Sequence, residues 1–375
     1  MTPQRVLHLV AQMGVGGAEA VVAELAQGGS RLGWQTAVAS AGGIRATRLE
    51  SAGLAVNFPV SLMQRRRPSS ILRAGRDLRR VLASYEPDVV VAHNVGVTAL
   101  AALVGITTRG LPLVSVFHGV AERDYPFAAQ VLDRGPHALV TVSSALNRQL
   151  HEAGMRRTDV RVIPNAVSVP DLPDRGRARS ELGLNGDIPV ALCLGRMVAQ
   201  KRHDVLLRAW AQVPGDAILL LAGDGNLRDA HERLAVELGV DDRVQFLGER
   251  DDVPRLLSAA DVVTLASDWE GQPIALLEAM AAGRPVVATS VGGLSEIVRS
   301  GEGTLVPPSD PWALADCLSS YLYDATQRQT RGNAARLGVL ERHSPARMLD
   351  AYAEALSHAT NRASEDKYLQ VLRRK

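Results

Sequence analysis

The sequence predicts an α/β protein built from two Rossmann-like, doubly wound domains that face a central cleft. The chain has 375 residues, which is more than one hydrophobic core usually supports. Short β-rich runs alternate with helical stretches from end to end, as expected for parallel sheets built of βαβ units. This alternation stops once, near the middle of the chain, and then restarts. A protein of two α/β domains follows.

The first half contains five runs that predict strands, at residues 6–10, 36–40, 89–92, 113–117 and 139–142. After Asn165 the sequence becomes rich in proline and charge for roughly two dozen residues, longer than an ordinary connection. We therefore expect an N-terminal domain over residues 1–168 and a linker over residues 169–186.

The second half predicts strands at residues 190–195, 218–222, 244–247, 262–265 and 285–289. They define a C-terminal domain over residues 187–345, followed by a helical segment at 346–375. Ligands of open α/β sheets bind at the carboxyl ends of the strands. Functional residues should therefore come directly after strands.

Composition excludes several classes of protein. A net charge of +2 does not supply the basic face that nucleic-acid binding requires. Cys193 and Cys317 stand alone, which argues against disulfides and zinc, and we expect neither a metal nor a bound cofactor. The longest apolar run, residues 95–106, is too short to span a membrane, and the N-terminal apolar stretch is too short and polar for a signal peptide. We expect a cytoplasmic protein.

The strongest functional pattern follows the strand at 262–265. Glu270 precedes a helix predicted over residues 274–282, and Glu278 lies in its second turn. Pro273 suits the first helical position, where its missing N–H costs nothing. The free amides of such a turn attract anions, and carboxylates accept hydrogen bonds from vicinal hydroxyls. The residues of this turn expected to bind ligand are Gln272, Ile274 and Ala275.

A second pattern follows the strand at 190–195. Arg196 stands at its end and Lys201 lies five residues later, a pairing suited to a diphosphate without a metal. Arg202 adds a third positive charge. Glycine-containing turns at 222–225 and 246–250, the latter ending at Arg250, permit close backbone approach, although each is a weak signal.

In the first half, Gly16 and Gly17 lie between the first predicted strand and helix. A dinucleotide fingerprint beginning at Gly14 would place Glu19 where the last glycine belongs, which disfavours a dehydrogenase. His118 ends the strand at 113–117 and points an imidazole toward the cleft, whereas His93, at another strand end, is left outside the predicted site.

Taken together, these motifs resemble the family 4 retaining glycosyltransferases of GT-B fold. The resemblance spans nearly the whole chain and includes residues 163–165 and 278–287. It implies that Arg196 and Lys201 hold the donor phosphates, that Glu278 binds the ribose and that Glu270 engages the transferred sugar. Further implied contacts are Gly16 and Gly17 with the phosphates or acceptor, His118 with the sugar near the reacting carbon, and the loop around Arg250 with the base.

The resemblance also implies a reaction. A hexose-type sugar passes with retention from a nucleotide diphosphate, with a UDP-sugar favoured, to a hydroxyl of a small-molecule or glycan acceptor, without a metal. The segment from Pro345 onward is implied to cross back to the first domain. Gln272-Pro273 departs from the commoner pattern of an aromatic residue followed by glycine, which puts the sugar's identity in doubt.

Several alternatives remain open. An isomerase (epimerase) of the same fold would turn over donor without acceptor, and a non-catalytic nucleotide-sugar sensor would bind donor without transfer. Each candidate site residue also has a purely structural interpretation. Glu278, Arg196 and Lys201 could be solvated surface charges, and Glu270 could be an ordinary loop carboxylate. His118 could serve only as a hydrogen-bond partner of a backbone carbonyl, and Gly16 and Gly17 could serve only the tight turn between strand and helix. The stretch from Arg65 to Arg80 is best read as a solvated basic face, with contact to anionic lipid as the alternative.

Overall fold

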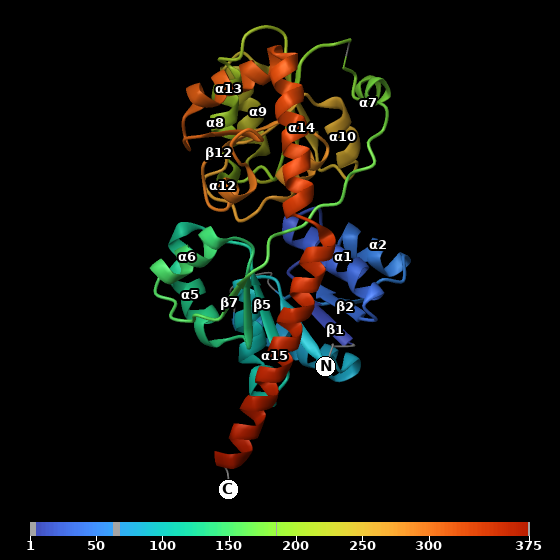
Figure 1. Cartoon of the computed structure of the whole chain (residues 1–375), viewed down its shortest axis with the longest axis vertical. Helices are drawn as coiled ribbons and strands as arrows, with labels where there is room; N and C mark the ends of the chain where they lie inside the picture. The colour runs from blue at the N-terminus through green and yellow to red at the C-terminus, as the bar shows by residue number, and fades with distance from the viewer. Residues whose placement is uncertain (1–4, 63–67, 185, 374–375) are drawn as a thin grey trace. The chain divides into compact units, whose positions relative to one another are not determined.

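The computed structural model describes residues 5–62, 68–184 and 186–373, and the chain forms two compact units (Figure 1). Unit 1 comprises Met1–Asn165 with Pro345–Lys375, and unit 2 comprises Ala166–Ser344. Each unit contains one parallel sheet covered by helices, so the predicted α/β class with two doubly wound sheets is confirmed.

The sheet of unit 1 has seven strands in the order β3-β2-β1-β4-β5-β6-β7, all paired in parallel. Its strands are β1 (Arg5–Leu9), β2 (Gln35–Ser40), β3 (Val56–Pro59), β4 (Val89–Ala92), β5 (Leu113–Phe117), β6 (Ala138–Thr141) and β7 (Val160–Val162). The strand order reverses between β1 and β4, which makes this pair the topological switch point of the unit.

Helices cover both faces of this sheet. They are α1 (Gly17–Arg31), α2 (Ile44–Ser51), α3 (Pro68–Tyr85), α4 (Val95–Leu103), α5 (Tyr125–Arg134), α6 (Ser144–Glu152) and α15 (Pro345–Arg373), with short 3-10 turns at Thr107–Arg109 and Glu122–Asp124. Leu7 and Leu9 belong to one apolar cluster with residues of α3 and α4, whereas Val10 and Val38 belong to another with residues of α1 and α2. Side chains alternate along a strand, so each strand supplies both layers of core.

The long helix α15 returns to unit 1 and packs along β4, β5 and β6 (Figure 1). Its attachment includes charged groups: Arg362 pairs with Asp159, and Arg161 pairs with Glu354 at 3.3 Å. Asp159 also accepts from the buried Arg157 at 2.9 Å. Burial raises the pKa of the Asp159 carboxyl, but the hydrogen bond from Arg157 and the charges of Arg157 and Arg362 outweigh it and hold that pKa below the usual value. The stretch of α15 from Glu354 to Arg362 is thereby fixed to unit 1.

Unit 2 contains a six-stranded parallel sheet in the order β10-β9-β8-β11-β12-β13. Its strands are β8 (Val190–Leu194), β9 (Ile218–Ala222), β10 (Val244–Gly248), β11 (Val262–Leu265), β12 (Val286–Thr289) and β13 (Gly303–Val306). Its helices are α7 (Arg175–Glu181), α8 (His203–Trp210), α9 (Arg228–Glu237), α10 (Val253–Ala259), α11 (Ile274–Ala281), α12 (Leu294–Ile297), α13 (Pro311–Tyr323) and α14 (Ala325–Arg342), with 3-10 turns at Ala199–Lys201 and Asp241–Arg243. The order reverses between β8 and β11, so these strands form the switch point.

The segment at 169–186, expected to be a linker, contains α7 and belongs to unit 2. Arg175 donates to Asp261 at 2.8 Å and Arg179 donates to the carbonyl of Ala259 at 3.1 Å. The bond from Arg179, together with bonds from Arg175 to the carbonyls of Ser258 at 3.2 Å and Ala260 at 3.1 Å, satisfies carbonyls at the end of α10, which lack helical partners. The helix α7 is therefore a packed element of the second unit.

The ten strands predicted from the sequence are present with small shifts of their ends. Three strands were not predicted: β3, β7 and β13, each at the edge of a sheet. Within the described residues, no helix combines the length and apolar character needed to cross a bilayer.

Candidate donor site

The centre of the candidate site lies at the switch point of unit 2. Parallel strands β8 and β11 are neighbours, and the loops that follow them diverge to opposite sides of the sheet. Lys201 ends the turn after β8, whereas Glu270 lies in the loop after β11. A ligand held between these loops would sit where open α/β sheets usually bind their ligands.

Lys201 and Glu270 form an ion pair at this point. The ammonium of Lys201 donates to Oε1 of Glu270, and the hydroxyl of Ser267 donates to the same oxygen at 2.6 Å. Glu270 is 5% exposed, so the pair is largely withdrawn from water. Both contacts fall on Oε1, which leaves Oε2 unused by either donor. An ammonium has three N–H donors, so Lys201 keeps donors for a second acceptor.

Backbone and side-chain bonds fix this loop. Thr289, at the end of β12, donates to the carbonyl of Ser267 at 2.6 Å, and Gln200 donates to the carbonyl of Trp269 at 2.9 Å. The glycine at 292 has φ +51°, and a Cβ there would lie 1.9 Å from the carbonyl oxygen of Glu270. Any side chain at this position would displace the loop that holds Glu270.

The loops after β8, β9 and β10 are tied together by their backbones. Gly195 donates to Ala222 at 3.0 Å, Met197 to Asp224 at 2.9 Å and Gly223 to Gly248 at 2.8 Å. Next to these bonds the side chain of Arg196 is exposed, and no hydrogen bond or ion pair holds its guanidinium within the described chain. Arg196 therefore has donors available for a bound anion.

The helix α11 begins as the sequence predicts, with one correction. Pro273 is not the first helical residue: it is the N-cap, with extended φ −67° and ψ 118°, and the helix starts at Ile274. The proline ring fits either position because both tolerate its φ. The amides of Ile274 and Ala275 belong to the first turn, whose N–H groups lie ahead of any helical acceptor. Gln272 is buried beside this turn, and Glu278 is half-buried one turn further on.

Two other arginines are held by carboxylates. Arg202 has φ +47° and donates to Asp204 at 3.0 Å and to Asp268 at 2.9 Å. Arg250 donates to Asp252 through two nitrogens, at 2.8 and 2.6 Å, and these bonds raise its pKa. Arg202 thus stabilises the loop that leads to Glu270, rather than adding a third free positive charge.

In unit 1, Gly16 is the N-cap of α1, with extended backbone and no side-chain cap. The carboxylate of Glu19 folds back to this point, because a Cβ at Gly16 would lie 2.2 Å from its Oε2. A negative group near a helix N-terminus is stabilised by the helix dipole. The turn of Gly16 and Gly17 thus has the character of an anion site, with Glu19 as its internal anion.

His118 follows β5 in the same unit. Its Nε2 atom is buried without a hydrogen-bond partner, and burial lowers the pKa of the imidazole to about 4. The ring is therefore neutral at physiological pH. His93 stacks on it with ring centroids 5.8 Å apart and an interplanar angle of 22°.

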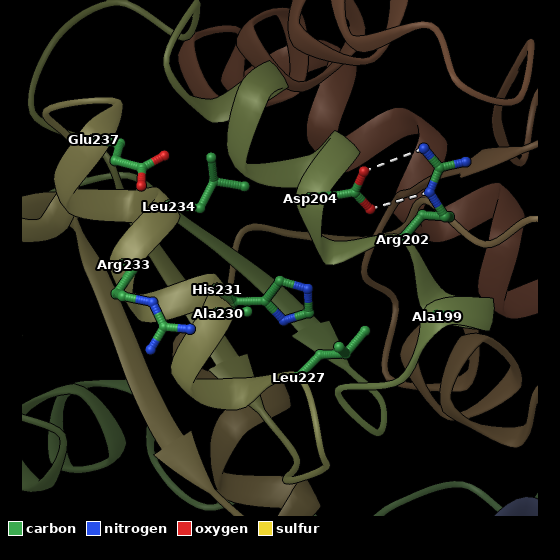
Figure 2. Close-up of a pocket in the computed structure, with 9 residues that line it drawn as sticks. All are labelled: Ala199, Arg202, Asp204, Leu227, Ala230, His231, Arg233, Leu234 and Glu237. Carbon is green, nitrogen blue, oxygen red and sulfur yellow. Dashed lines mark hydrogen bonds and ion pairs between the residues drawn. The ribbon is translucent and has the colours of Figure 1, made fainter.

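A cavity of about 460 Å³ lies between α8 and α9 of unit 2 (Figure 2). Its lining includes His231, Arg233 and the Arg202–Asp204 pair, together with the apolar side chains of Leu227 and Leu234. None of the residues predicted for the site lines it. No group of three or more His, Cys, Asp or Glu side chains within the described ranges is arranged to hold a metal ion.

The structure brings the second-unit predictions together in two places: Lys201 with Glu270, and Gln272, Ile274, Ala275 and Glu278 at the start of α11. Gly16, Gly17 and His118 lie in unit 1. The sequence reasoning missed Ser267, Thr289 and Gly292, which hold Glu270 in place. Only the glycine carried a signal, since a pair of glycines follows β12.

Both halves of the chain match models of known protein families. Residues 188–324 match the family model described as "Glycosyl transferases group 1", and residues 15–169 match "Glycosyltransferase Family 4". The crystal structure of Anabaena Alr3699/HepE, in complex with UDP and glucose, superposes with a TM-score of 0.83 at 25% identity, over 94% of this chain and 99% of that one.

Two curated relatives extend the agreement. The lipopolysaccharide core biosynthesis glycosyltransferase LpsE of Rhizobium meliloti is 32% identical over 62% of this chain and 68% of its own length. The D-inositol 3-phosphate glycosyltransferase of Mycolicibacterium smegmatis is 32% identical over 77% of this chain and 73% of its own length.

The two parallel sheets, the matches to both family models and the structural neighbour define a glycosyltransferase of GT-B fold. Within this class, the chain belongs to glycosyltransferase family 4.

Proposed function

We propose that this glycosyltransferase transfers a hexose-type sugar with retention from a UDP-sugar to a hydroxyl of a small-molecule or glycan acceptor, without a metal ion. The observation that carries the proposal is the largely buried Lys201–Glu270 pair at the switch point of unit 2, with the exposed Arg196 in the same loop after β8 as Lys201. Positive groups in this position stabilise the charge that develops on a departing diphosphate.

Each predicted residue has a proposed task. Arg196 and the remaining donors of Lys201 bind the phosphate oxygens. The amides of Ile274 and Ala275 bind further oxygens of the ligand, and Gln272 shapes this turn. Glu278 accepts hydrogen bonds from the ribose hydroxyls, and the loop at Arg250 contacts the base through its backbone. Gly16 and Gly17 approach the phosphates or the acceptor.

The proposed chemistry is a front-face substitution. The bond between the anomeric carbon and the β-phosphate oxygen breaks while the bond to the acceptor oxygen forms on the same face. The acceptor proton passes to the departing phosphate oxygen, so UDP leaves and no protein nucleophile is needed. Glu270 and His118 position the sugar, and catalysis consists chiefly of orientation and charge stabilisation.

The proposal that the donor carries uracil rests on the structural neighbour, which was crystallised in complex with UDP and glucose. The two curated relatives act on different acceptors by their names, one in lipopolysaccharide core biosynthesis and one on D-inositol 3-phosphate. The acceptor is therefore proposed as a class, a hydroxyl of a small molecule or of a glycan.

A peripheral contact with anionic lipid is proposed for α3. This helix carries Arg73, Arg76, Arg79 and Arg80, and beside them Leu72 is 72% exposed. Basic groups around an exposed apolar side chain suit the surface of an anionic bilayer. Arg65, Arg66 and Arg67 lie outside the described residues.

The deciding experiment is a thermal-shift screen of the purified chain against UDP-, GDP- and ADP-sugars, with and without EDTA. A ligand that binds only the native state stabilises it by about 2.7 kcal/mol at 100 times its Kd. We expect a shift with the UDP-sugar that EDTA leaves unchanged. An increase in melting temperature that disappears with EDTA contradicts metal independence. An increase seen only with a GDP- or ADP-sugar contradicts the assignment of uracil as the donor base.

Product analysis separates transfer from the alternatives. With D-inositol 3-phosphate and oligosaccharides as acceptors, the proton NMR coupling at the new anomeric centre should match that of the donor. Turnover of UDP-sugar to a second UDP-sugar without acceptor supports the epimerase. Binding without either reaction supports the sensor.

A further inference from the structure

Three imidazoles, those of the buried His8 and His93 and of the partly buried His118, form a line across neighbouring strands of unit 1. Nδ1 of His8, in β1, lies 2.9 Å from Nε2 of His93, which follows β4. His93 in turn stacks on His118, which follows β5. His8 and His93 are each 1% exposed.

Strand register explains the alignment. His8 pairs with Val91 and Leu9 with Ala92, and the His93 amide continues the ladder by donating to Leu9 at 3.0 Å. His93 is therefore two residues beyond the partner of His8 and shares its face of the sheet. The pairing of Ala92 with Ser115 places His118 two residues further again. The line runs diagonally from within the sheet to its carboxyl edge.

The hydrogen bond between His8 and His93 requires one nitrogen to donate and the other to accept. Burial and the two neighbouring imidazoles lower the pKa of His93 well below its usual value, and no carboxylate contributes to that shift. Both rings are therefore neutral, and the bond fixes the orientation of the His93 ring. That ring is the surface against which His118 stacks.

A buried polar nitrogen without a hydrogen-bond partner lowers the stability of the fold by about 1–3 kcal/mol. Nε2 of His8 and Nδ1 of His93 have no hydrogen-bond partner in the described structure. Leucine or valine would pack these positions without that cost, as they do elsewhere in the strands. The arrangement is better explained by a need for a fixed imidazole at the edge of the sheet.

We propose that His8 and His93 are positioning residues, whose hydrogen bond holds the His118 imidazole in the orientation that contacts the transferred sugar. This inference rests on the proposed function, because it takes the contact between His118 and the sugar from there. Neither His8 nor His93 touches substrate. The residues that determine the geometry of the proposed site thus include His8 and His93, which lie within the sheet.

The test compares His8→Leu with His8→Asn in the full chain. Leucine removes the hydrogen bond, whereas the asparagine amide can occupy the place of Nδ1 and keep it. Turnover of UDP-glucose is measured as release of UDP with water as acceptor. We expect His8→Leu to lower kcat about ten-fold with little change in KM, and His8→Asn to restore most of it.

The same substitution is then made in His118→Ala. If His8 acts through His118, His8→Leu has no further effect in that background, because coupled residues are not additive. An equal loss in both backgrounds overturns the proposal. His118→Ala with unchanged turnover locates the failure in the sugar contact of the proposed function instead.

A second readout does not depend on activity. In protein labelled with ¹⁵N-histidine, long-range proton–nitrogen spectra report the tautomer of each ring, and His118 is assigned by its absence in His118→Ala. We expect one tautomer in the wild type and in His8→Asn, and altered His118 signals in His8→Leu. Unchanged His118 signals in a folded His8→Leu protein overturn the proposal.

Discussion

Lys201 and Glu270 illustrate how a single pair can serve both structure and binding. A buried ion pair pays a large desolvation cost and is weak evidence for stability. Here Ser267 supplies a second hydrogen bond to the carboxylate, and Thr289 fixes Ser267. The carboxylate is therefore rigid, and it holds the ammonium of Lys201 near the place proposed for the donor phosphates. Such preorganisation avoids reorganisation when charge develops.

Replacement of Lys201 tests this role. Lys201→Ala should lower kcat about 100-fold while donor Kd rises less, because the ammonium acts mainly on charge that appears during bond breaking. Steady-state kinetics with UDP-glucose and calorimetric binding measure the two effects. Arg208→Ala, which removes an exposed positive charge from α8, is the control and should change neither. Equal losses in Kd and kcat/KM would show ground-state binding only.

Glu278 provides the complementary test. We expect Glu278→Ala to weaken donor binding about ten-fold or more, since a charged acceptor for ribose hydroxyls is worth about 1.5–3 kcal/mol. Glu278→Gln keeps one carbonyl acceptor, so its affinity for the donor should lie between those of the wild type and of Glu278→Ala. Titration with UDP and with 2′-deoxy-UDP reads out the ribose contact directly. If Glu278→Ala lowers the affinity for both nucleotides equally, the assignment to the ribose hydroxyls is wrong.

For single residues, the sequence predicted the candidate site residues that belong to motifs, but not the residues whose hydrogen bonds hold them in place. Glu270 and Lys201 follow strands at recognisable spacings, so their proximity could be expected. Ser267 and Thr289 are small hydroxyl residues whose importance depends on one hydrogen bond each, and nothing in their local sequence marks them. Arg202 was counted as a third positive charge, whereas the structure pairs it with Asp204, two residues away, and with Asp268, 66 residues away in the chain.

Among the elements, the central strands and the edge strand β10 were predicted, whereas the edge strands β3, β7 and β13 were not. Central strands such as β8 and β11 are continuous apolar runs because both faces are buried. The strands β3 and β7 have no fully buried residue, and β13 has one, so their sequences lack that pattern. The cap of α11 was misplaced by one residue, since proline fits both the N-cap and the first helical position.

The helix α3 carries a prediction of its own. We expect the chain to bind vesicles of phosphatidylglycerol and phosphatidylcholine, and Leu72→Asp to weaken that binding about ten-fold, because it places a negative charge among arginines at the bilayer surface. Co-sedimentation with vesicles measures the effect. Leu337→Asp, at a leucine of α14 that is 74% exposed, is the matched control. Equal binding by both variants would leave α3 as a solvated basic face.

At the scale of the whole molecule, each unit buries neutral histidines. Burial lowers the pKa of His8 and His118 in unit 1 to about 4, and that of His203 in unit 2 to about 3. The unfolded chain protonates these groups near their ordinary value of about 6.5. Between that value and the folded pKa, the unfolded state therefore binds more protons, and the free energy of unfolding falls as pH falls.

Acid should accordingly destabilise both units, and it should do so before most carboxylates titrate. The stabilisation from each neutral histidine is complete above pH about 6.5 and declines by up to about 1.4 kcal/mol per pH unit toward the folded pKa. Calorimetric unfolding at pH 7.5, 6.5, 5.5 and 4.5 (conditions spaced by about one unit across this window) should show Tm falling. His203→Leu should flatten the decline of the transition that belongs to unit 2 and leave that of unit 1 unchanged, because His203 lies in unit 2, where its ring packs against that of His231. If His203→Leu flattens neither transition, the buried imidazole of unit 2 does not control acid stability there. If it flattens both, the two units unfold as one, and their separate cores do not define separate thermodynamic domains.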